Sequence, residues 1–378
     1  MTWDIFCTVI DNYGDIGVSW RLARQLSMEH ALPVRLWVDD LAAFQHIRPE
    51  VDATLAVQQL AGVEIRRWTS LLPDIEVGEV VIEALACNLP DEFIARMALR
   101  QPPPVWLNLE YLTAEAWGAG VHGLPSPHPR LALCKHFFMP GYTLQTGGLT
   151  REAWLAPERD RFQANAAARA AYFSNLGLPA EQAGELRISL FCYENNALPG
   201  LLQAWANGID SVRVLVPRGK ALPLIAAWLG CENLAAGTTW QRGALSLHVL
   251  PMLDQDSYDR LLWACDLNFV RGEDSFTRAQ FAARPLVWQA YVQDDEAHLP
   301  KLDAFLDLYC ADMDSELAAQ TRDLWHAWNQ ETGLAAAWPK LGRALPALTA
   351  HARVWDRQLA AHPDLVTNLL NFCRKWLK

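Results

Sequence analysis

Short apolar runs alternate with helical spacing along the first half of the chain. Trp3–Ile10 has the composition of a buried strand, and Val18, Leu22 and Leu26 then recur every four residues, as on one face of a helix. Similar apolar runs follow at 34–38, 63–68, 80–85 and 105–109. Alternation of strand and helix is typical of a parallel sheet with helices on both faces. We therefore predict a Rossmann-like domain over residues 1–155.

The same alternation begins again at Leu186. Strands are expected at 186–193, 211–217, 245–251, 267–271 and 286–291, with helices at 221–229, 258–264, 315–330 and 340–361. Residues 118–148 contain several prolines and glycines and are expected to form loops, and 158–175 is expected to be one helical segment between the halves. This pattern predicts a second Rossmann-like domain over residues 180–360.

The final segment, 364–378, places Leu365, Leu369, Phe372 and Trp376 on one helical face. Two such α/β domains facing a central cleft make the GT-B fold of glycosyltransferases, in which the last helix typically crosses back to pack on the first domain. Ligands of such sheets bind beyond the carboxyl ends of the strands. A hinged periplasmic binding protein has a similar layout, so the pattern alone leaves the chemistry open.

Composition narrows the class of partner. The 378 residues are 51% hydrophobic and 20% charged, enough for two cores. A formal net charge of −11 argues against a nucleic-acid partner and suits either simple solubility or a cationic partner. The eight cysteines include no CxxC pair, the first residues do not resemble a signal peptide, and no apolar run approaches the ~20 residues that span a membrane. We expect a cytoplasmic protein with no membrane partner.

Two carboxylates, Asp11 and Asp15, flank the exit of the first strand, beside Asn12, Tyr13, Gly14 and Gly17. The glycines allow a ligand to approach the backbone closely. Paired carboxylates fit a guanidinium, which bonds them in a forked geometry, whereas an Asp at this position is also a common helix cap. The segment lacks the GxGxxG spacing, so the acidic pair Asp39-Asp40 after the second strand is weak support for a nicotinamide site.

A second polar corner follows the strand that ends at Arg271. Gly272 turns the chain, and Glu273, Asp274 and Ser275 then open a helix. Free N–H groups at a helix start attract phosphate, and a carboxylate there can bond sugar hydroxyls, although Asp and Ser are also ordinary caps. The corner has no Walker A pattern, and no cluster of metal-ligand type accompanies it, so neither a phosphate-loop ATPase nor a metal cofactor is expected.

Four aromatic residues of the second half fall at strand ends or helix starts on this same edge: Phe191, Tyr193, Tyr258 and Tyr291. A flat base needs stacking surfaces and one or two hydrogen bonds to its edge, which Gln255 can supply. Each aromatic taken alone is better explained by a place in the core than by contact with a ligand. Their shared position favours a nucleotide pocket.

Several longer motifs resemble the EarP family of protein-arginine rhamnosyltransferases. They lie in both halves of the chain, at residues 11–21 (DNYGDIGVSWR), 108–112 (NLEYL), 135–142 (KHFFMPGY), 191–194 (FCYE) and 271–276 (RGEDSF). The resemblance implies a GT-B fold and an inverting transfer of rhamnose from dTDP-β-L-rhamnose. It implies as acceptor one arginine of translation elongation factor P, whose modification activates the factor to rescue ribosomes stalled at polyproline.

The resemblance also implies roles for residues. Asp15 is expected to be the catalytic base, with Asp11 beside it and Glu273 contributing to catalysis. Glu273, Asp274 and Ser275, with Arg271, correspond to contacts around the sugar and diphosphate, and the nucleotide pocket corresponds to Phe191, Tyr193, Gln255, Tyr258 and Tyr291. Asn12, Tyr13, Gly14 and Gly17 form the loop on the acceptor side.

Three other functions stay open at this point. A GT-B enzyme acting on a small molecule, or a sugar-nucleotide epimerase, has the same nucleotide-binding half. A non-catalytic module that binds nucleotide sugars requires the pocket but not the carboxylates at the first strand's exit, which argue mildly against it.

Overall fold

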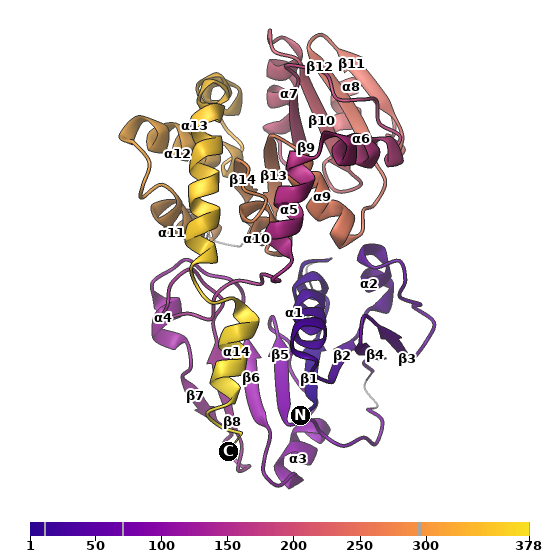
Figure 1. Ribbon diagram of the computed structural model, residues 1–378, viewed down its shortest axis with the longest axis vertical. Helices are drawn as coiled ribbons and strands as arrows, with labels where there is room; N and C mark the ends of the chain where they lie inside the picture. Colours follow the sequence, from indigo (N-terminus) through magenta and orange to yellow (C-terminus); the bar gives the residue numbers. More distant parts are fainter. Residues whose placement is uncertain (11–12, 70–71, 293–296, 378) are drawn as a thin grey trace. The chain divides into compact units, whose positions relative to one another are not determined.

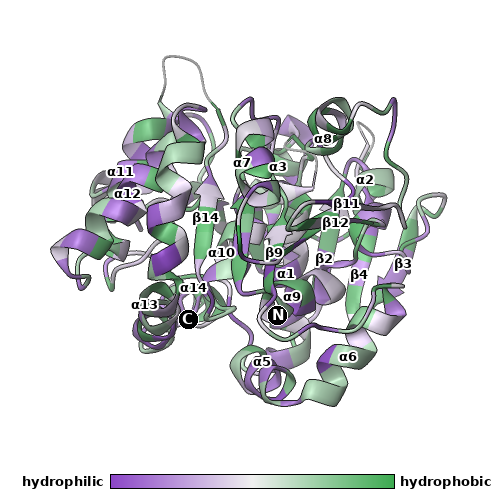
Figure 2. Ribbon diagram, turned by 90° about the horizontal axis from the view of Figure 1, so that it is seen from above, coloured by the Kyte–Doolittle hydropathy of each residue, from purple (hydrophilic) through white to green (hydrophobic). Residues whose placement is uncertain are grey.

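The computed structural model describes residues 1–10, 13–69, 72–292 and 297–377. They form two compact units (Figure 1): unit 1 comprises Met1–Ala153 and Leu359–Lys378, and unit 2 comprises Trp154–Gln358. Each unit contains one sheet with helices packed against it. Most of the inner strands are mainly hydrophobic along their length, as Figure 2 shows, because helices cover both faces of a parallel sheet.

The sheet of unit 1 has the strand order β3-β4-β2-β1-β5-β6-β8-β7. The six inner strands are parallel, and β3 and β7 are antiparallel edges. The bounds are β1 Trp3–Cys7, β2 Val34–Val38, β3 Val57–Leu60, β4 Val63–Arg67, β5 Val80–Ala84, β6 Val105–Leu109, β7 Pro125–Pro127 and β8 Cys134–Phe138. The helices are α1 Gly14–His30, α2 Leu41–Ile47, α3 Asp91–Leu99, α4 Trp117–Val121 and α14 Leu365–Cys373.

One face of this sheet packs on α3. Phe6 stacks on Trp37 at a ring distance of 5.3 Å and meets Phe93 of α3 at 4.8 Å. Asp4, fully buried on the same face, accepts hydrogen bonds from Arg35 at 2.7 and 2.6 Å, and also from the Trp37 indole and the Gly78 N–H. A buried carboxylate with this many donors stabilises the start of the sheet.

The sheet of unit 2 has the order β11-β12-β10-β9-β13-β14, parallel except for the edge strand β11. Its strands are β9 Leu186–Leu190, β10 Val212–Pro217, β11 Thr239–Arg242, β12 Leu245–Leu250, β13 Leu267–Arg271 and β14 Leu286–Gln289. Its helices are α5 Leu155–Ala164, α6 Ala166–Asn175, α7 Leu198–Ala206, α8 Leu222–Leu229, α9 Gln255–Ala264, α10 Asp274–Gln280, α11 His298–Tyr309 and α12 Ser315–Asn329. The long helix α13, Leu334–Ala360, begins in unit 2 and ends in unit 1.

The segment expected as one helix over 158–175 forms two, α5 and α6. Asn165 separates them, and its side chain accepts the Ala168 N–H at the start of α6. Both helices pack on α9: Phe162 lies 5.9 Å from Trp263, and the Tyr172 hydroxyl donates to the Ser257 carbonyl at 2.8 Å. Unit 2 therefore begins at Trp154 and includes residues that the sequence analysis left between the two domains.

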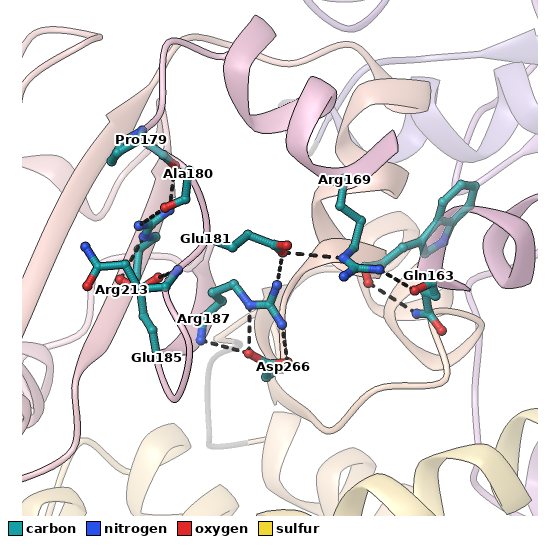
Figure 3. Close-up of polar contacts among 11 residues, drawn as sticks. Gln163, Arg169, Pro179, Ala180, Glu181, Glu185, Arg187, Arg213 and Asp266 are labelled. Atoms are coloured by element: carbon teal, nitrogen blue, oxygen red, sulfur yellow. Dashed lines mark hydrogen bonds and ion pairs between the residues drawn. The ribbon is translucent and has the colours of Figure 1, made fainter. Parts of the chain in front are cut away.

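Ion pairs hold the chain that leads from α6 into β9 (Figure 3). Arg187 of β9 donates to Asp266 at 2.9 Å and also pairs with Glu181, which lies 3.4 Å from Arg169. Arg213 of β10 donates to the carbonyls of Pro179 and Ala180 and pairs with Glu185 at 3.0 Å. These contacts fix the entry of the two central strands of unit 2.

The C-terminal helix α14 packs on unit 1. The Leu365 N–H donates to the Leu149 carbonyl at 2.8 Å, and the Asn368 amide donates to the Gly147 carbonyl at 3.0 Å. Gly148 adopts a φ of +80°, and a Cβ there would lie 2.5 Å from the Pro363 carbonyl oxygen, so only glycine fits. On β8, the His136 ring meets Phe372 at 5.4 Å and Trp376 at 4.7 Å.

The expectation of loops over 118–148 was wrong in part, because α4, β7 and β8 lie there. The strand β8 has the sequence CKHFF, which lacks a continuous apolar run. Its Lys135 pairs with Glu83 at 2.7 Å and lies 5.0 Å from the Trp106 ring, and its His136 faces α14. Tertiary contacts thus accommodate polar residues in an inner strand.

Two predicted strands end three residues earlier than expected. The first ends at Cys7 rather than Ile10, and the strand from Leu186 ends at Leu190 rather than Tyr193. The residues beyond these ends leave the sheet at its carboxyl edge and form loops there. Among the helices of the described ranges, none combines the length and apolarity required to cross a membrane.

We predict that acidification loosens the packing of α14. Burial lowers the pKa of His136 and of His122 from the ordinary value of 6.5. Both are neutral in the folded state, so their contribution to the free energy of unfolding is fully present above pH 6.5. Below pH 6.5 this contribution is lost, because the histidines of the unfolded chain take up protons before those of the folded chain. Between pH 7.5 and 5.5 the unfolding temperature of wild type is expected to fall more than that of His136→Phe, which keeps the ring contacts. The exposed-site control His30→Gln should follow wild type, and equal slopes for all three would contradict the prediction.

Candidate active site

The carboxyl ends of the parallel strands of unit 1 share one edge. The chain leaves β1 after Cys7 and returns into α1, while β5 and β6 end beside it at Ala84 and Leu109. This is the edge where α/β sheets of this type bind ligands. The loops that leave it carry Ile10, which is 63% exposed, and Tyr111.

Asp15 is the best-defined acidic group at this edge. It is the second residue of α1 and only 1% exposed. Its Oδ2 accepts the Ile10 N–H at 2.8 Å, and its Oδ1 lies 3.2 Å from the Tyr111 hydroxyl, which also lies 3.3 Å from the Leu85 carbonyl. The helix cap is Tyr13, which makes no side-chain cap bond, so Asp15 is not the cap. A carboxylate in the first turn of a helix is favoured by the helix dipole.

The other predicted residues of this loop have different outcomes. Asp11 and Asn12 lie outside the described residues. Gly14 begins α1, and the Gly17 N–H donates to the Tyr13 carbonyl at 2.9 Å. The Tyr13 ring contacts His46 at 5.8 Å. The segment after β1 is thus held by contacts with α1, with α2 and with Tyr111, two residues beyond β6.

Arg271 is the central charge at the carboxyl edge of unit 2. It is the last residue of β13 and 7% exposed. Its guanidinium carbon lies 4.4 Å from the centre of the Phe191 ring and 4.6 Å from that of Tyr193. Such cation–π contacts partly offset the cost of burial. The Nη1 nitrogen is buried with no hydrogen-bond partner among the described residues, so the charge is available to an anion.

Tyr258 and Ser275 lie against this arginine. The Tyr258 ring meets Phe191 at 5.5 Å, and burial raises the pKa of Tyr258 well above its usual range, although the nearby Ser275 hydroxyl and the charge of Arg271 lower it. The Ser275 hydroxyl accepts a hydrogen bond from the backbone N–H of Arg271 at 3.2 Å. It also donates a hydrogen bond to the backbone carbonyl of Arg271. Tyr258 therefore stays neutral, with its ring against Phe191.

The corner after β13 turns as the sequence predicts. Gly272 adopts a φ of +59°, and its carbonyl accepts the Trp288 indole N–H at 2.8 Å. Glu273 occupies the cap position of α10 without a side-chain cap bond, and Asp274 is the first helical residue. The Gln255 amide donates to the Asp274 carboxylate at 3.0 Å, which ties the start of α9 to the start of α10.

Tyr291 completes this group from the loop after β14. Its ring meets Tyr193 at 5.5 Å and its side chain is 56% exposed. The structure thus links six predicted donor-side residues through direct contacts: Phe191, Tyr193, Tyr258, Arg271, Ser275 and Tyr291. Two more, Gln255 and Asp274, contact each other at the starts of α9 and α10.

Comparison with known proteins decides the family. The family described as "Elongation-Factor P (EF-P) rhamnosyltransferase EarP" matches residues 3–374. A relative from Pseudomonas putida strain KT2440, named protein-arginine rhamnosyltransferase, is 50% identical over 376 residues, which cover 100% of this chain and 99% of the relative. The chain belongs to the EarP family. The assignment to the glycosyltransferases, made from the motifs, is confirmed.

Solved structures confirm the fold. The chain matches one described as "Structural basis for EarP-mediated arginine glycosylation of translation elongation factor EF-P" at 38% identity and a TM-score of 0.72, covering 100% of this chain and 99% of that one. It also matches MurG of Acinetobacter baumannii at 11% identity and a TM-score of 0.50, covering 99% of each chain. The prediction of a GT-B fold with two Rossmann-like domains is therefore confirmed for this EarP family member.

Two features of the site were missed by reasoning from the sequence. Tyr111 lies in a motif quoted for the family, but its contact with Asp15 joins positions 96 residues apart. Gly219, after β10, packs on Phe191, since a Cβ there would lie 3.2 Å from the ring. A polar or small residue just after a strand end was the available signal in both cases. Within the described ranges, no group of three His, Cys, Asp or Glu residues is arranged to hold a metal ion.

We predict that one buried ion pair maintains the geometry between α9 and α10. Arg278 donates to Asp259 at 3.1 and 2.7 Å, and both side chains are 1% exposed. Arg278→Met strands a buried carboxylate and is expected to lower the free energy of unfolding by about 3–5 kcal/mol. The double variant with Asp259→Leu should recover most of that loss in denaturant titration. A single variant as stable as wild type would refute this role.

Proposed function

We propose that this chain transfers rhamnose from dTDP-β-L-rhamnose to an arginine of translation elongation factor P, with inversion at the sugar. The observation that carries the proposal is Arg271, a buried cation enclosed by aromatic rings at the carboxyl edge of unit 2. An activated sugar on a nucleoside diphosphate complements this site in charge and in shape. The names of the relatives supply the sugar and the acceptor.

The donor is proposed to bind in unit 2. Its diphosphate pairs with Arg271, and its base stacks on the aromatic group of Phe191, Tyr193 and Tyr258, with Gln255 at the base edge. Glu273 and Asp274 then face the sugar hydroxyls at the start of α10, and Tyr291 closes the outer side of the pocket. The Ser275 hydroxyl already donates to the Arg271 carbonyl, so its proposed role is to hold that residue as well as to face the diphosphate.

The acceptor is proposed to meet the carboxylates of unit 1. An arginine nitrogen is a weak nucleophile because its lone pairs are delocalised and its pKa exceeds about 12. Asp15, together with Asp11, binds the guanidinium and orients one nitrogen. That nitrogen bonds to the anomeric carbon as the bond to the diphosphate oxygen breaks, and its proton passes to the Asp15 carboxylate. The transition state resembles an oxocarbenium ion, which the carboxylate of Glu273 helps to stabilise.

The leaving dTDP carries the electron pair of the broken bond. Arg271 offsets the charge that develops on it, so the proposal contains no metal ion and no cofactor besides the donor. The reaction is expected in the cytoplasm, where elongation factors act, and its product is expected to relieve ribosomes stalled at polyproline. The net charge of −11 suits a cationic acceptor side chain.

Mass spectrometry of elongation factor P tests the proposal. After incubation with this protein and dTDP-β-L-rhamnose, the factor should gain one deoxyhexose, localised to an arginine in a tryptic peptide. Donor hydrolysis or transfer to a small molecule with an unmodified factor would favour the alternative GT-B enzyme. Donor binding without product from any acceptor would favour a non-catalytic module.

We predict that Asp15→Asn removes transfer and keeps donor binding. The amide preserves the acceptor oxygen for the Ile10 N–H but takes up no proton, so turnover should fall by about 10²–10⁴-fold. Isothermal titration with dTDP-β-L-rhamnose should give the wild-type Kd. Asp39→Asn is the matched control, an exposed carboxylate that accepts the Val9 N–H at the same edge, and it should turn over normally. Turnover of Asp15→Asn at the wild-type rate would exclude it as the base.

We predict that Arg271→Met weakens donor binding. Methionine retains much of the packing against Phe191 and Tyr193 but loses the charge, so the Kd for dTDP should rise by about 30-fold or more. Arg242→Met, which removes an exposed arginine from the edge strand β11, should leave the Kd unchanged. Equal Kd values for wild type and Arg271→Met would mean that the diphosphate does not rest on this guanidinium.

A further inference from the structure

The last residue of β14 reaches a segment that belongs to a different strand. In the sheet of unit 2, β13 lies between β9 and β14. Nevertheless the Gln289 side chain accepts the Tyr193 N–H at 2.8 Å and donates to the Glu194 carbonyl at 3.3 Å. The chain that leaves β9 is therefore drawn past the end of β13 towards β14. Gln289 is 2% exposed, so both of its bonds are made away from water.

A second buried amide, that of Asn329, acts beside Gln289, and we call these two side chains the clasp. Asn329, at the end of α12, accepts the Ala290 N–H at 2.9 Å and donates to the Trp288 and Trp325 carbonyls at 2.8 Å. The fully buried Asn195 donates to the Trp328 carbonyl at 2.8 Å. Trp288 and Ala290, on either side of Gln289, and the loop after β9 that Gln289 holds are therefore all hydrogen-bonded to the C-terminal end of α12.

This clasp sets the surroundings of the Arg271 charge. Gln289 pairs with Arg271 in the register of β13 and β14. The segment that Gln289 holds carries Tyr193, whose ring lies 4.6 Å from the Arg271 guanidinium. Tyr291 follows Gln289 by two residues and meets the same Tyr193 ring at 5.5 Å. One side chain thereby determines where two aromatic walls of the pocket stand.

We propose that Gln289 is a positioning residue of the donor site, which acts by holding Tyr193 against Arg271. The inference rests on the proposed donor, since it concerns how tightly a nucleoside diphosphate binds. Buried amides contribute little net stability over apolar residues of the same shape, but an unmade bond in the interior is costly. A polar clasp at this position therefore fixes one geometry of the loop, which binding of a charged ligand requires.

Two substitutions separate positioning from stability. Gln289→Met keeps the volume and loses both hydrogen bonds. Gln289→Asn keeps a buried amide, at a smaller cost in folding, but is one methylene too short to reach Tyr193. Both should raise the Kd for dTDP about tenfold, as measured by titration calorimetry, and should raise the KM for dTDP-β-L-rhamnose in the same proportion. The kcat at saturating donor, with elongation factor P as acceptor, should stay within about twofold of wild type.

The matched control is Asn268→Leu. Asn268 is a fully buried amide in β13 that accepts from the Ser189 hydroxyl at 2.6 Å and donates to the Leu262 carbonyl at 3.0 Å, near the opposite end of the strand. It should lower the unfolding temperature without changing the Kd. Unchanged Kd values in both Gln289 variants, or an equal loss in Asn268→Leu, would overturn the inference. Wild-type protein that binds neither dTDP nor dTDP-β-L-rhamnose would overturn the proposed donor itself.

Discussion

The placement of one buried cation organises the carboxyl edge of unit 2. A guanidinium removed from water without a carboxylate partner is costly to keep, and none of the described carboxylates pairs with Arg271, whose guanidinium lies against two aromatic rings. Phe191 and Tyr193 follow the end of the neighbouring strand β9, where their rings contact the Arg271 guanidinium. Ser275 of α10 forms hydrogen bonds with the Arg271 backbone. The amides of Gln289 and Asn329 then hold those loops in place. Folding thus prepares a positive site before any ligand arrives.

Unit 1 presents the opposite charge by a comparable device. Asp15 lies at the start of α1, where the helix dipole favours a carboxylate, and the Ile10 N–H and the Tyr111 hydroxyl orient its oxygens. The two units therefore carry groups of opposite charge, as the proposed transfer from an anionic donor to a cationic acceptor requires. This difference in charge follows from which side chains stand at the carboxyl edges, after β1 in unit 1 and at the end of β13 in unit 2.

The sequence was a good guide wherever burial imposes an apolar run. All ten strands predicted from such runs are present, because both faces of each sheet are covered. The edge strands β3, β7 and β11 and the inner strand β8 were missed, since their sequences VQQL, PSP, TWQR and CKHFF lack a continuous apolar run. The donor-side residues were found through motifs, whereas the Asp15–Tyr111 contact and the Gln289 clasp were not, because they join segments about 96 residues apart. Pairings of that range depend on the order of strands in the sheet, which periodicity does not encode.

The return of the chain to unit 1 through α14 has a consequence for biosynthesis. Unit 2 is inserted between two parts of unit 1, so the ribosome finishes it before the last residues of unit 1 are made. Until Leu365 bonds to Leu149 and Phe372 and Trp376 cover His136, one face of the first sheet lacks its final helix. The first part of unit 1 therefore has an exposed sheet face while more than two hundred residues of unit 2 are synthesised. A premature stop near the end of the message would leave a complete second half joined to an unfinished first half, which is a natural substrate for chaperones and proteases.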